Sequence, residues 1–338
     1  MNKKIILVNR PRGPVKETDF KVVSELLNTV LKQGEVLVRV EWISIDPAER
    51  VWISGKTSYI PPVTIGTVVK GLGVGYVITS KSPAFKKGNY VSGFLGWQEF
   101  ATVHFSQLSK LPSYENPQRY LGVLGLTGLT AYFSVTEIAR PQKKEVMVVS
   151  SAAGAVGSIA CQIGKMKGCK VIGICGSDDK AAWLMNTLKI DGCINFKTEK
   201  SVSQALRKLC PEGVDIYIDN VGGAILDAVL ANIRKNARIV LCGAISSYDH
   251  DRAPPIHNYP VAIAMSATLE GFIVWDDYKN RFELAIKQLS RWVQEKKLIH
   301  REHVVEGLEN APKALGMVMD GRNFGKMIVR VVHEQPHL

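Results

Sequence analysis

Residues 145–180 read EVMVVSSAAGAVGSIACQIGKMKGCKVIGICGSDDK, and this stretch decides the fold. The apolar, β-branched run Val146–Val149 has the length of a fully buried strand. A turn of small residues, Ser150–Gly157, follows it. Ile159–Lys167 carries apolar residues at helical intervals, and Lys170–Cys175 is typical of a second buried strand. The order strand, turn, helix and strand is the context that a dinucleotide-binding fingerprint requires.

The small-residue turn has the composition of a phosphate-binding loop. Gly154 would let the backbone approach a pyrophosphate, and Gly157 would let the helix pack closely on the strand. The N–H groups at the start of the helix would then bind the phosphates. The full fingerprint has a further glycine two residues before Gly154, where this chain has Ala152. The turn alone is equally compatible with an ordinary tight connection, so the nucleotide prediction depends on the whole unit.

The end of the second strand predicts which dinucleotide is bound. An NAD site places a carboxylate near this point, where it bonds the ribose 2′-hydroxyl. Here Ile172–Ser177 contains no carboxylate; Asp178 and Asp179 come slightly late, and Lys180 follows them. A missing carboxylate and a nearby ammonium suit the 2′-phosphate of NADPH. The alternative is that Lys180 lies on a solvated first helical turn that the aspartates cap.

Composition limits the remaining possibilities. A chain of 338 residues suits two domains, and 46% hydrophobic with 22% charged residues is typical of a globular protein. The net charge is +12, yet no block of basic residues interleaved with aromatic ones marks a nucleic-acid surface. We therefore expect no nucleic-acid partner, and attribute the charge to attraction of an anionic cofactor or to solubility.

The cysteines and the N-terminus predict a cytosolic protein. No CxxC pair occurs, and most of the six cysteines lie in apolar runs, which predicts reduced core residues instead of disulfides or a zinc site. The apolar run near Met1 is too short for a signal peptide, and no segment has the length and composition of a membrane span. The six cysteines are Cys161, Cys169, Cys175, Cys193, Cys210 and Cys242.

The chain before the fingerprint is β-rich and predicts a separate domain, a distorted barrel. Phe20–Thr29 fits either a helix or a strand. The glycines of Gly71–Gly75 have no helix after them, so we interpret them as barrel bends. The expected strands are Ile5–Val8, Glu35–Ile45, Gly73–Thr79, Tyr90–Phe94 and Trp97–Val103.

Helices and strands alternate after the fingerprint, which predicts a doubly wound parallel sheet. The β character of the C-terminal tail suggests a return to the first domain. We predict a β-rich domain over 1–122, a nucleotide-binding domain over 123–299 and the return over 300–338. Expected strands are Cys193–Phe196, Val214–Asp219, Ala237–Cys242, Thr268–Trp275 and Lys326–Val332, and expected helices are 180–188, Ser201–Leu209, Ala224–Asn232, Val261–Ala267, Tyr278–Glu295 and Ala311–Met319.

The chain resembles the zinc-independent, NADPH-dependent double-bond reductases of the medium-chain dehydrogenase/reductase superfamily. This branch includes prostaglandin and leukotriene reductases, plant alkenal reductases and the bacterial curcumin reductase, which the C-terminal third resembles most. The resemblance implies a Rossmann domain and a GroES-like catalytic domain. The matching stretches span nearly the whole chain: 58–62, 96–100, 128–132, 152–157, 219–223, 242–246, 271–274, 306–312 and 323–326.

The resemblance also implies the residues that hold NADPH. Many relatives have a tyrosine where this chain has Phe196, and a phenol there could bond the 2′-phosphate. Phenylalanine cannot, so the resemblance implies that Lys180 and Ser177 take a larger share. The implied cofactor residues are Ala152, Ala153, Gly154, Ala155, Val156, Gly157, Gly176, Ser177, Lys180, Phe196, Asn220, Cys242, Gly243, Ala244, Ile245, Ser246, Phe272, Ile273, Val274 and Asn323.

The implied chemistry is hydride transfer to the β-carbon of an α,β-unsaturated aldehyde or ketone. Zinc alcohol dehydrogenases need an early cysteine, but none precedes Cys161 and no metal-ligand spacing occurs, so we expect no metal. An enolate needs a hydrogen-bond donor, and Tyr248 matches a tyrosine that relatives place beside the nicotinamide. Its alternative role is packing on its own loop. The cofactor ribose could also donate. Tyr59 either lines the substrate pocket or is an amphipathic surface tyrosine.

Two rival functions remain open on the sequence. One is a zinc-independent NADPH:quinone oxidoreductase, which shares fold and cofactor. The other is a non-catalytic NADPH-binding sensor or structural protein. The resemblance further implies a homodimer, joined through the apolar run Thr268–Trp275 at a sheet edge; the alternative is one more buried strand in a monomer.

Overall fold

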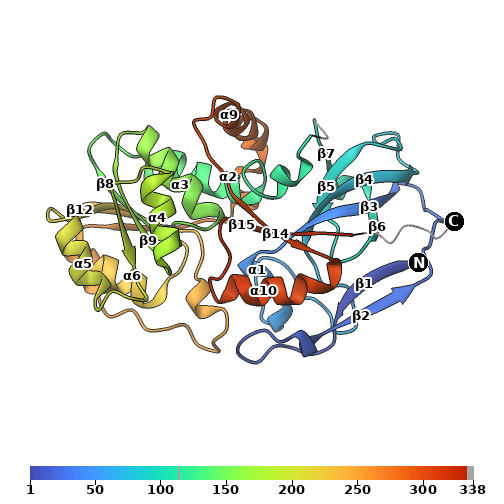
Figure 1. Ribbon diagram of the computed structural model, residues 1–338, viewed down its shortest axis with the longest axis horizontal. Coiled ribbons are helices and arrows are strands. Elements are labelled where there is room, and N and C mark those ends of the chain that lie inside the picture. The colour runs from blue at the N-terminus through green and yellow to red at the C-terminus, as the bar shows by residue number, and fades with distance from the viewer. Residues whose placement is uncertain (113–114, 333–338) are drawn as a thin grey trace. The chain divides into compact units, whose positions relative to one another are not determined.

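The computed structural model describes residues 1–112 and 115–332. The chain forms an α/β protein with two compact units, each described by itself below. The first unit combines Met1–Gly122 with the chain from Glu302 onward, and the second is Val123–Arg301. In Figure 1 the N-terminal blue and C-terminal red segments both contribute to the first unit.

The second unit is built on a six-stranded parallel sheet in the order β10-β9-β8-β11-β12-β13. The order turns back at β8, so the sheet is doubly wound as the alternation predicts, and the Rossmann-type fold class is confirmed. Its strands are β8 (Val146–Ser150), β9 (Lys170–Cys175), β10 (Gly192–Asn195), β11 (Val214–Asp219), β12 (Ile233–Leu241) and β13 (Thr268–Gly271).

Helices cover both faces of this sheet (Figure 1). A Cβ at Gly164 would lie 2.0 Å from Met147 Cε, so α3 packs closely on the face that Met147 shares with Val171. Leu206 and Val229 instead belong to the hydrophobic core on the other face. The helices are α2 (Leu126–Phe133), α3 (Ala155–Met166), α4 (Asp178–Asn186), α5 (Val202–Leu209), α6 (Gly223–Leu230), α7 (Tyr259–Ala264), α8 (Val274–Tyr278) and α9 (Phe282–Gln294), with a π-helical segment (Ser134–Ala139) after α2.

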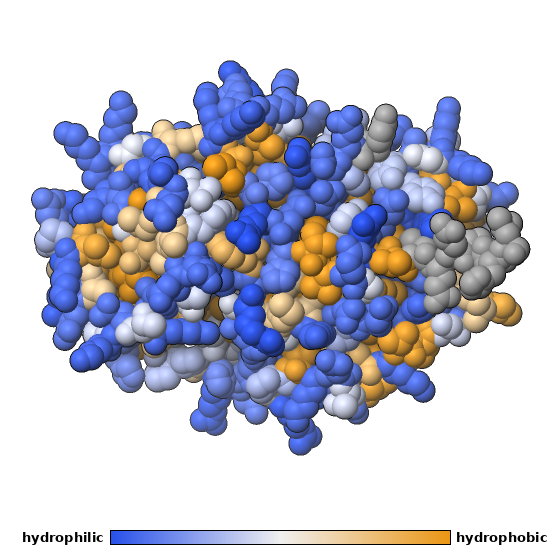
Figure 2. All heavy atoms as spheres, viewed as in Figure 1, coloured by the Kyte–Doolittle hydropathy of each residue, from blue (hydrophilic) through white to orange (hydrophobic). Residues whose placement is uncertain are grey.

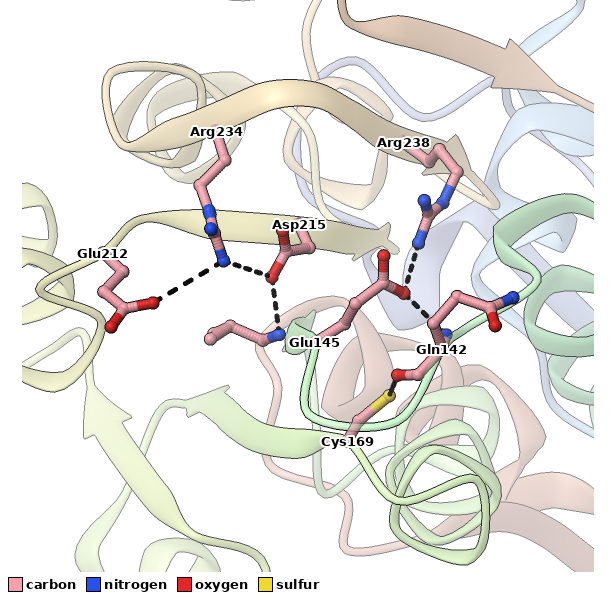
Figure 3. Close-up of polar contacts among 8 residues, drawn as sticks. Gln142, Glu145, Cys169, Glu212, Asp215, Arg234 and Arg238 are labelled. Atoms are coloured by element: carbon pink, nitrogen blue, oxygen red, sulfur yellow. Dashed lines mark hydrogen bonds and ion pairs between the residues drawn. The ribbon is translucent and has the colours of Figure 1, made fainter.

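The amino edge of the sheet is fixed by ion pairs and hydrogen bonds (Figure 3). Asp215 accepts from the backbone N–H of Val146 at 2.8 Å and pairs with Arg234 at 3.4 Å. Glu145 pairs with Arg238 at 2.5 Å. These contacts tie the starts of β8, β11 and β12 together, which leaves the opposite, carboxyl edge for binding.

The prediction of one strand over Thr268–Trp275 is wrong in its second half. β13 ends at Gly271, where its partner β12 also ends, with Leu241 opposite Gly271. Without a neighbouring strand, the chain turns into α8, and the Asp277 carboxylate accepts from the N–H of Ile273 at 2.9 Å. The expected long helix over Tyr278–Glu295 is also shorter: Tyr278 belongs to α8, Lys279–Arg281 form a 3₁₀ turn, and α9 begins at Phe282.

The first unit contains a seven-stranded sheet and a separate antiparallel pair of β1 with β2. Phe20–Thr29, which the sequence left undecided, contains strand β2, not a helix. The expected strand over Trp97–Val103 begins later, at Phe100. The strands are β1 (Asn2–Leu7), β2 (Phe20–Glu25), β3 (Glu35–Ser44), β4 (Leu72–Ser80), β5 (Tyr90–Phe94), β6 (Phe100–His104), β7 (Leu108–Lys110), β14 (Glu302–Glu306) and β15 (Lys326–Arg330), with helices α1 (Pro47–Ser54) and α10 (Ala311–Met319).

The C-terminal return enters this sheet through β15, which pairs with β3 on one side and β14 on the other. Lys326, at the start of β15, is buried, and its ammonium bonds the carbonyl of Ile45 at 3.1 Å and the carboxylate of Asp46 at 2.5 Å. A buried charge that is paired and hydrogen-bonded is tolerated, so this contact anchors the returning strand beside α1.

The surface seen in Figure 2 is mainly hydrophilic, with hydrophobic side chains in small separate patches. Among the described residues, no helix has both the length and the apolar character that crossing a membrane requires.

Candidate functional site

The predicted cofactor residues of the second unit all follow the carboxyl ends of its parallel strands. Each strand of the sheet is continued by at least one of them, from the turn after Ser150 to the segment after Gly271. Since parallel strands end at the same edge, the register brings residues from six separate stretches to one edge of the sheet. This is where an open α/β sheet binds its ligands.

The fingerprint turn is tightly constrained at Ser151 and Gly157. Ser151 has a φ of +48°, a left-handed conformation that is costly for a residue with a side chain. A Cβ at Gly157 would lie 2.3 Å from the Ser151 carbonyl oxygen, so only glycine lets α3 begin so close to β8. The expected packing role of Gly157 is confirmed. Gly154 is also cramped, since a Cβ there would lie 2.9 Å from Ser151 Oγ.

Asp219, at the end of β11, holds the next turn in place. Its buried Oδ1 accepts from the backbone N–H groups of Val221 at 3.0 Å and Gly222 at 2.9 Å. The same oxygen accepts from Tyr217 at 2.8 Å and from Ser150 at 3.2 Å. Burial raises the pKa of Tyr217 well above its usual range, and the Asp219 charge adds to this. Asp219 therefore joins β8, β11 and the turn between β11 and α6.

Asp219 lies within one of the stretches that resemble the reductases, but no role was predicted for it. A carboxylate at a strand end, followed by Asn-Val-Gly-Gly, was the available signal. Such a residue accepts from the N–H groups of the turn that follows it, as Asx turns do. Two left-handed glycines, Gly222 (φ +71°) and Gly223 (φ +54°), complete this turn.

Asn220 lies at the edge as predicted, but its amide nitrogen is already engaged. Nδ2 donates to the Ser150 carbonyl at 2.8 Å, and the backbone N–H of Asn220 donates to Ser150 Oγ at 2.9 Å. The side chain thus bridges the ends of β8 and β11. One hydrogen of the Asn220 NH₂ group is thus used at Ser150, so a bond to a ligand would use the second hydrogen or the side-chain carbonyl oxygen.

Tyr248 lies beside the ends of β11 and β12. The backbone N–H of Ala244 donates to its phenol oxygen at 3.1 Å. A Cβ at Gly243 would lie 3.5 Å from this oxygen and 3.4 Å from the Asn220 carbonyl oxygen, which places the phenol next to the Asn220 turn. Burial raises the pKa of Tyr248; the Ala244 hydrogen bond opposes this and the Asp219 charge supports it. The phenol is therefore a neutral donor at physiological pH.

Ser246 supports the same loop. Its hydroxyl donates to the Val221 carbonyl at 2.6 Å, and Ser247 donates to the Ala244 carbonyl at 2.7 Å. Cys242 is buried enough that the pKa of its thiol rises to about 12. The segment from Cys242 to Tyr248 is therefore anchored to the Asp219 turn at several points, and its residues are half-buried.

Helix α4 begins shortly after the end of β9. Ser177 is the N-cap of α4, and its hydroxyl accepts from the Lys180 N–H at 3.4 Å. The alternative that the aspartates cap this helix is wrong, because Asp178 and Asp179 already lie in its first turn. Burial lowers the pKa of Lys180, whereas the nearby Cys175 thiol raises it and Lys197 lowers it.

All six cysteines are free, and two of them meet here. The sulfur atoms of Cys175 and Cys193 lie 3.5 Å apart. The hydrogen bond from Cys193 lowers the pKa of Cys175, and with Lys180 nearby this makes Cys175 the more acidic thiol of the pair. The hydrogen bond to Cys175, followed by burial, raises the pKa of Cys193.

Phe196 is exposed and lies over Gly176. A Cβ at Gly176 would lie 3.1 Å from Phe196 Cε1 and 3.4 Å from Lys197 Cε. Lys197, which sequence reasoning did not single out, thus reaches the same strand end as Lys180.

The remaining candidates lie on separate elements. Phe272–Val274 follow β13 in the second unit, and Phe272 packs edge-on against Tyr278 with ring centres 6.0 Å apart. Asn323 belongs to the first unit, where its amide donates to the Gly325 carbonyl at 2.9 Å. Tyr59, also in the first unit, is 53% exposed and meets the Trp52 ring edge-on at 6.5 Å.

The family follows from comparison with known proteins. Residues 3–111 match the family described as the N-terminal domain of oxidoreductase, and residues 155–291 match the one described as zinc-binding dehydrogenase. Over 98% of its length the chain is 38% identical to the NADPH-dependent curcumin reductase of Escherichia coli, covering 97% of that protein. The chain belongs to the medium-chain dehydrogenase/reductase superfamily, in its double-bond reductase branch.

Two further relatives support this placement in the double-bond reductase branch. The chain is 36% identical to the NADP-dependent 2-alkenal reductase of Nicotiana tabacum, over 98% of both proteins. The crystal structure of CurA from Vibrio vulnificus in complex with NADPH has a TM-score of 0.92 and 36% identity, covering 98% of this chain and all of that one. Within residues 1–112 and 115–332, no group of three or more His, Cys, Asp or Glu side chains could hold a metal ion.

The residues of this double-bond reductase fit NADPH. The close approach at Gly157 places the first N–H groups of α3 beside the fingerprint turn, where a pyrophosphate binds. Two lysines and a serine hydroxyl gather at the end of β9, and a carboxylate that would select a ribose hydroxyl is missing from the strand end itself.

Proposed function

We propose that this protein is an NADPH-dependent reductase of the carbon–carbon double bond in α,β-unsaturated aldehydes and ketones. The observation that carries the proposal is the neutral phenol of Tyr248, held by the Ala244 N–H at the carboxyl edge of the nucleotide-type sheet. Curcumin and alkenals, named for two relatives, both contain a double bond conjugated to a carbonyl.

When bound, NADPH supplies a hydride for the β-carbon of the substrate. The chain's task is then to stabilise the charge that develops on the carbonyl oxygen. Tyr248 would donate its phenolic proton in a hydrogen bond to that oxygen, because its own oxygen already accepts from Ala244. A preorganised donor of this kind needs no reorganisation during the reaction.

We further propose that NADPH binds at the carboxyl edge of the sheet. The turn from Ala152 to Gly157 would hold the pyrophosphate, and the segments Cys242–Ser246 and Phe272–Val274 would lie along the nicotinamide half, together with Asn220. Gly176, Ser177, Lys180 and Phe196 would surround the adenosine. Asn323, in the first unit, stays a prediction from the resemblance. The support is that these residues, Asn323 apart, follow the ends of six parallel strands.

For the substrate we propose an aromatic surface on the first unit. Tyr59 meets Trp52, and Trp52 meets Phe94 with ring centres 6.0 Å apart. Tyr59 and Phe94 are both exposed in that unit. Flat, apolar groups conjugated to an enone would stack on such rings.

We also propose a homodimer in the cytoplasm, joined through the edge strand near 268–275. β13 ends the sheet on one side, and its residues are exposed. Exposed apolar side chains on neighbouring elements, Tyr259, Ile263 and Trp275, would be covered by a second copy. Sedimentation analysis of the wild-type protein tests the dimer.

The deciding experiment follows the oxidation of NADPH and NADH with three acceptors: a medium-chain 2-alkenal, curcumin and a benzoquinone. Turnover of the two enones with NADPH, and much less with NADH, is expected. Product analysis should find the saturated carbonyl compound, because the hydride goes to the β-carbon and water supplies the proton that the α-carbon takes up.

Other results would favour the rivals. Turnover of the benzoquinone alone would make the protein a quinone reductase of the same superfamily. Tight binding of NADPH without turnover of any acceptor would contradict an enzymatic role and favour a sensor or structural protein.

A further inference from the structure

Lys180 and Lys197 approach each other from two different strand ends. Lys180 lies in the first turn of α4, after β9, and Lys197 lies in the turn after β10. β9 and β10 are neighbouring parallel strands, with Asn195 opposite Cys175. Their carboxyl ends therefore bring both lysines to one place at the edge of the sheet.

Asn195 holds the two turns together. Its amide Nδ2 donates to Asp178 Oδ1 at 2.7 Å, which ties the end of β10 to the start of α4. Its Oδ1 accepts from the backbone N–H of Lys197 at 3.1 Å. The backbone of Lys197 is thus fixed relative to α4 by one side chain that uses both its donor and its acceptor.

Gly176 leaves space for the Lys197 side chain to cross. A Cβ at position 176 would lie 3.4 Å from Lys197 Cε, which is the carbon that carries the ammonium group. The Phe196 ring lies beside it, 3.1 Å from the same point. Lys197 is an exposed residue, but its Cε lies over the strand end.

Two ammonium groups held close together are unfavourable unless an anion joins them. Lys180 is half-buried, and burial with repulsion from Lys197 lowers its pKa. The Asp178 carboxylate, which lies two residues before Lys180, accepts from Asn195. An anion with several oxygens would relieve the repulsion between the two ammonium groups. Its oxygens would also replace the water that Lys180 loses on burial.

We propose that Lys197 is a specificity-determining residue that binds the 2′-phosphate of NADPH together with Lys180. It supplies the contact that Phe196 cannot make, because a phenylalanine ring has no hydrogen-bond donor. A ribose 2′-hydroxyl carries no charge, so NADH would gain nothing from Lys197. This inference rests on the NADPH dependence proposed above and assigns a residue to it.

The test measures binding, not turnover, by calorimetric titration of wild type and variants with 2′-AMP, NADPH and NADH. Lys197→Met should weaken 2′-AMP and NADPH by about tenfold, the size of one charge-assisted hydrogen bond, and leave NADH unchanged. Lys197→Arg should retain most of the affinity. Phe196→Tyr in the Lys197→Met background should restore part of it. Lys208→Met, which removes an exposed lysine of α5, is the control of equal charge change.

Three results would overturn the assignment of Lys197. They are equal losses for NADPH and NADH, equal losses in Lys197→Met and Lys208→Met, or unchanged affinity for 2′-AMP in Lys197→Met. Thermal unfolding of each variant shows whether the fold is intact. A wild-type protein that binds NADH as well as NADPH and ignores 2′-AMP would contradict the proposed NADPH dependence itself. Wild-type selectivity for NADPH that is undiminished in Lys197→Met would contradict only the role of Lys197.

Discussion

The backbone N–H of Ala244 donates a hydrogen bond to the phenol oxygen of Tyr248 across 3.1 Å. This contact fixes the ring between the ends of β11 and β12 and leaves the phenolic proton for another acceptor. Burial raises the pKa of the phenol, so the proton stays on Tyr248 at neutral pH. A donor and its orientation are therefore both set by the fold before any substrate binds.

Tyr248→Phe should lower kcat for 2-alkenals by about a hundredfold, because one preorganised donor to the enolate oxygen is lost. The affinity for NADPH should change little. Tyr76→Phe, which removes a phenol from β4 of the first unit, is the matched control and should retain full activity. Steady-state kinetics with NADPH binding measured separately gives both numbers. A kcat that stays within twofold of wild type would transfer the donor role to the cofactor ribose or to solvent.

Asp219→Ala should destabilise the second unit by about 3 kcal/mol, because it leaves the N–H groups of Val221 and Gly222 without their acceptor. NADPH affinity should fall as well, since the turn beside Tyr248 loses its support. Asp320→Ala, which removes an exposed acid paired with Arg322, should cost less than about 0.5 kcal/mol. Urea unfolding compares the two. Equal effects of both variants would show that Asp219 is not the support of this turn.

Much of the fold was predictable from periodicity. The buried strands of the second unit are short apolar runs, and β11 was predicted to the residue. The prediction of a strand over all of Thr268–Trp275 was wrong because hydrophobicity alone cannot show that the neighbouring strand ends at Leu241. Pairing decides where such a run stops being a strand, and pairing is a property of the whole sheet.

The candidate site was predictable where glycine or strand-end chemistry marks it, as at Gly157. Asn220 was placed correctly, but its bond to the Ser150 carbonyl depends on a strand 70 residues earlier in the chain. Lys197 was missed because a lysine in an exposed turn carries no signal of its own. Only the structure shows that its side chain lies over Gly176 and that its backbone N–H is held by Asn195.

Gly157→Ala should abolish NADPH binding or folding of the second unit, because the added methyl group would lie 2.3 Å from the Ser151 carbonyl oxygen. The three nearest atoms belong to the backbone of Ser151 and Ala152, so no side-chain rotation can relieve the clash. Gly316→Ala is the control, since a Cβ there meets no atom within 4 Å. In α10 it should stabilise the protein by about 0.5–1 kcal/mol. Thermal unfolding and NADPH titration of both variants test this pair; an unchanged Gly157→Ala protein would contradict the close packing of α3 on β8.

Glu49→Gln should stabilise the protein more at pH 8 than at pH 5. Glu49 is fully buried in α1; burial raises its pKa well above the usual range, the Asp46 charge adds to this, and Lys326 opposes it. A carboxyl whose pKa is raised on folding contributes stability below its unfolded pKa of about 4.3, and this contribution is lost as the pH rises through the folded pKa. Glutamine stays neutral throughout, so the loss at high pH should vanish. Thermal unfolding at both pH values measures the difference, with the exposed Glu199→Gln as control. A wild-type protein whose advantage over Glu49→Gln grows with pH would instead show an ionised Glu49 that is stabilised by Lys326.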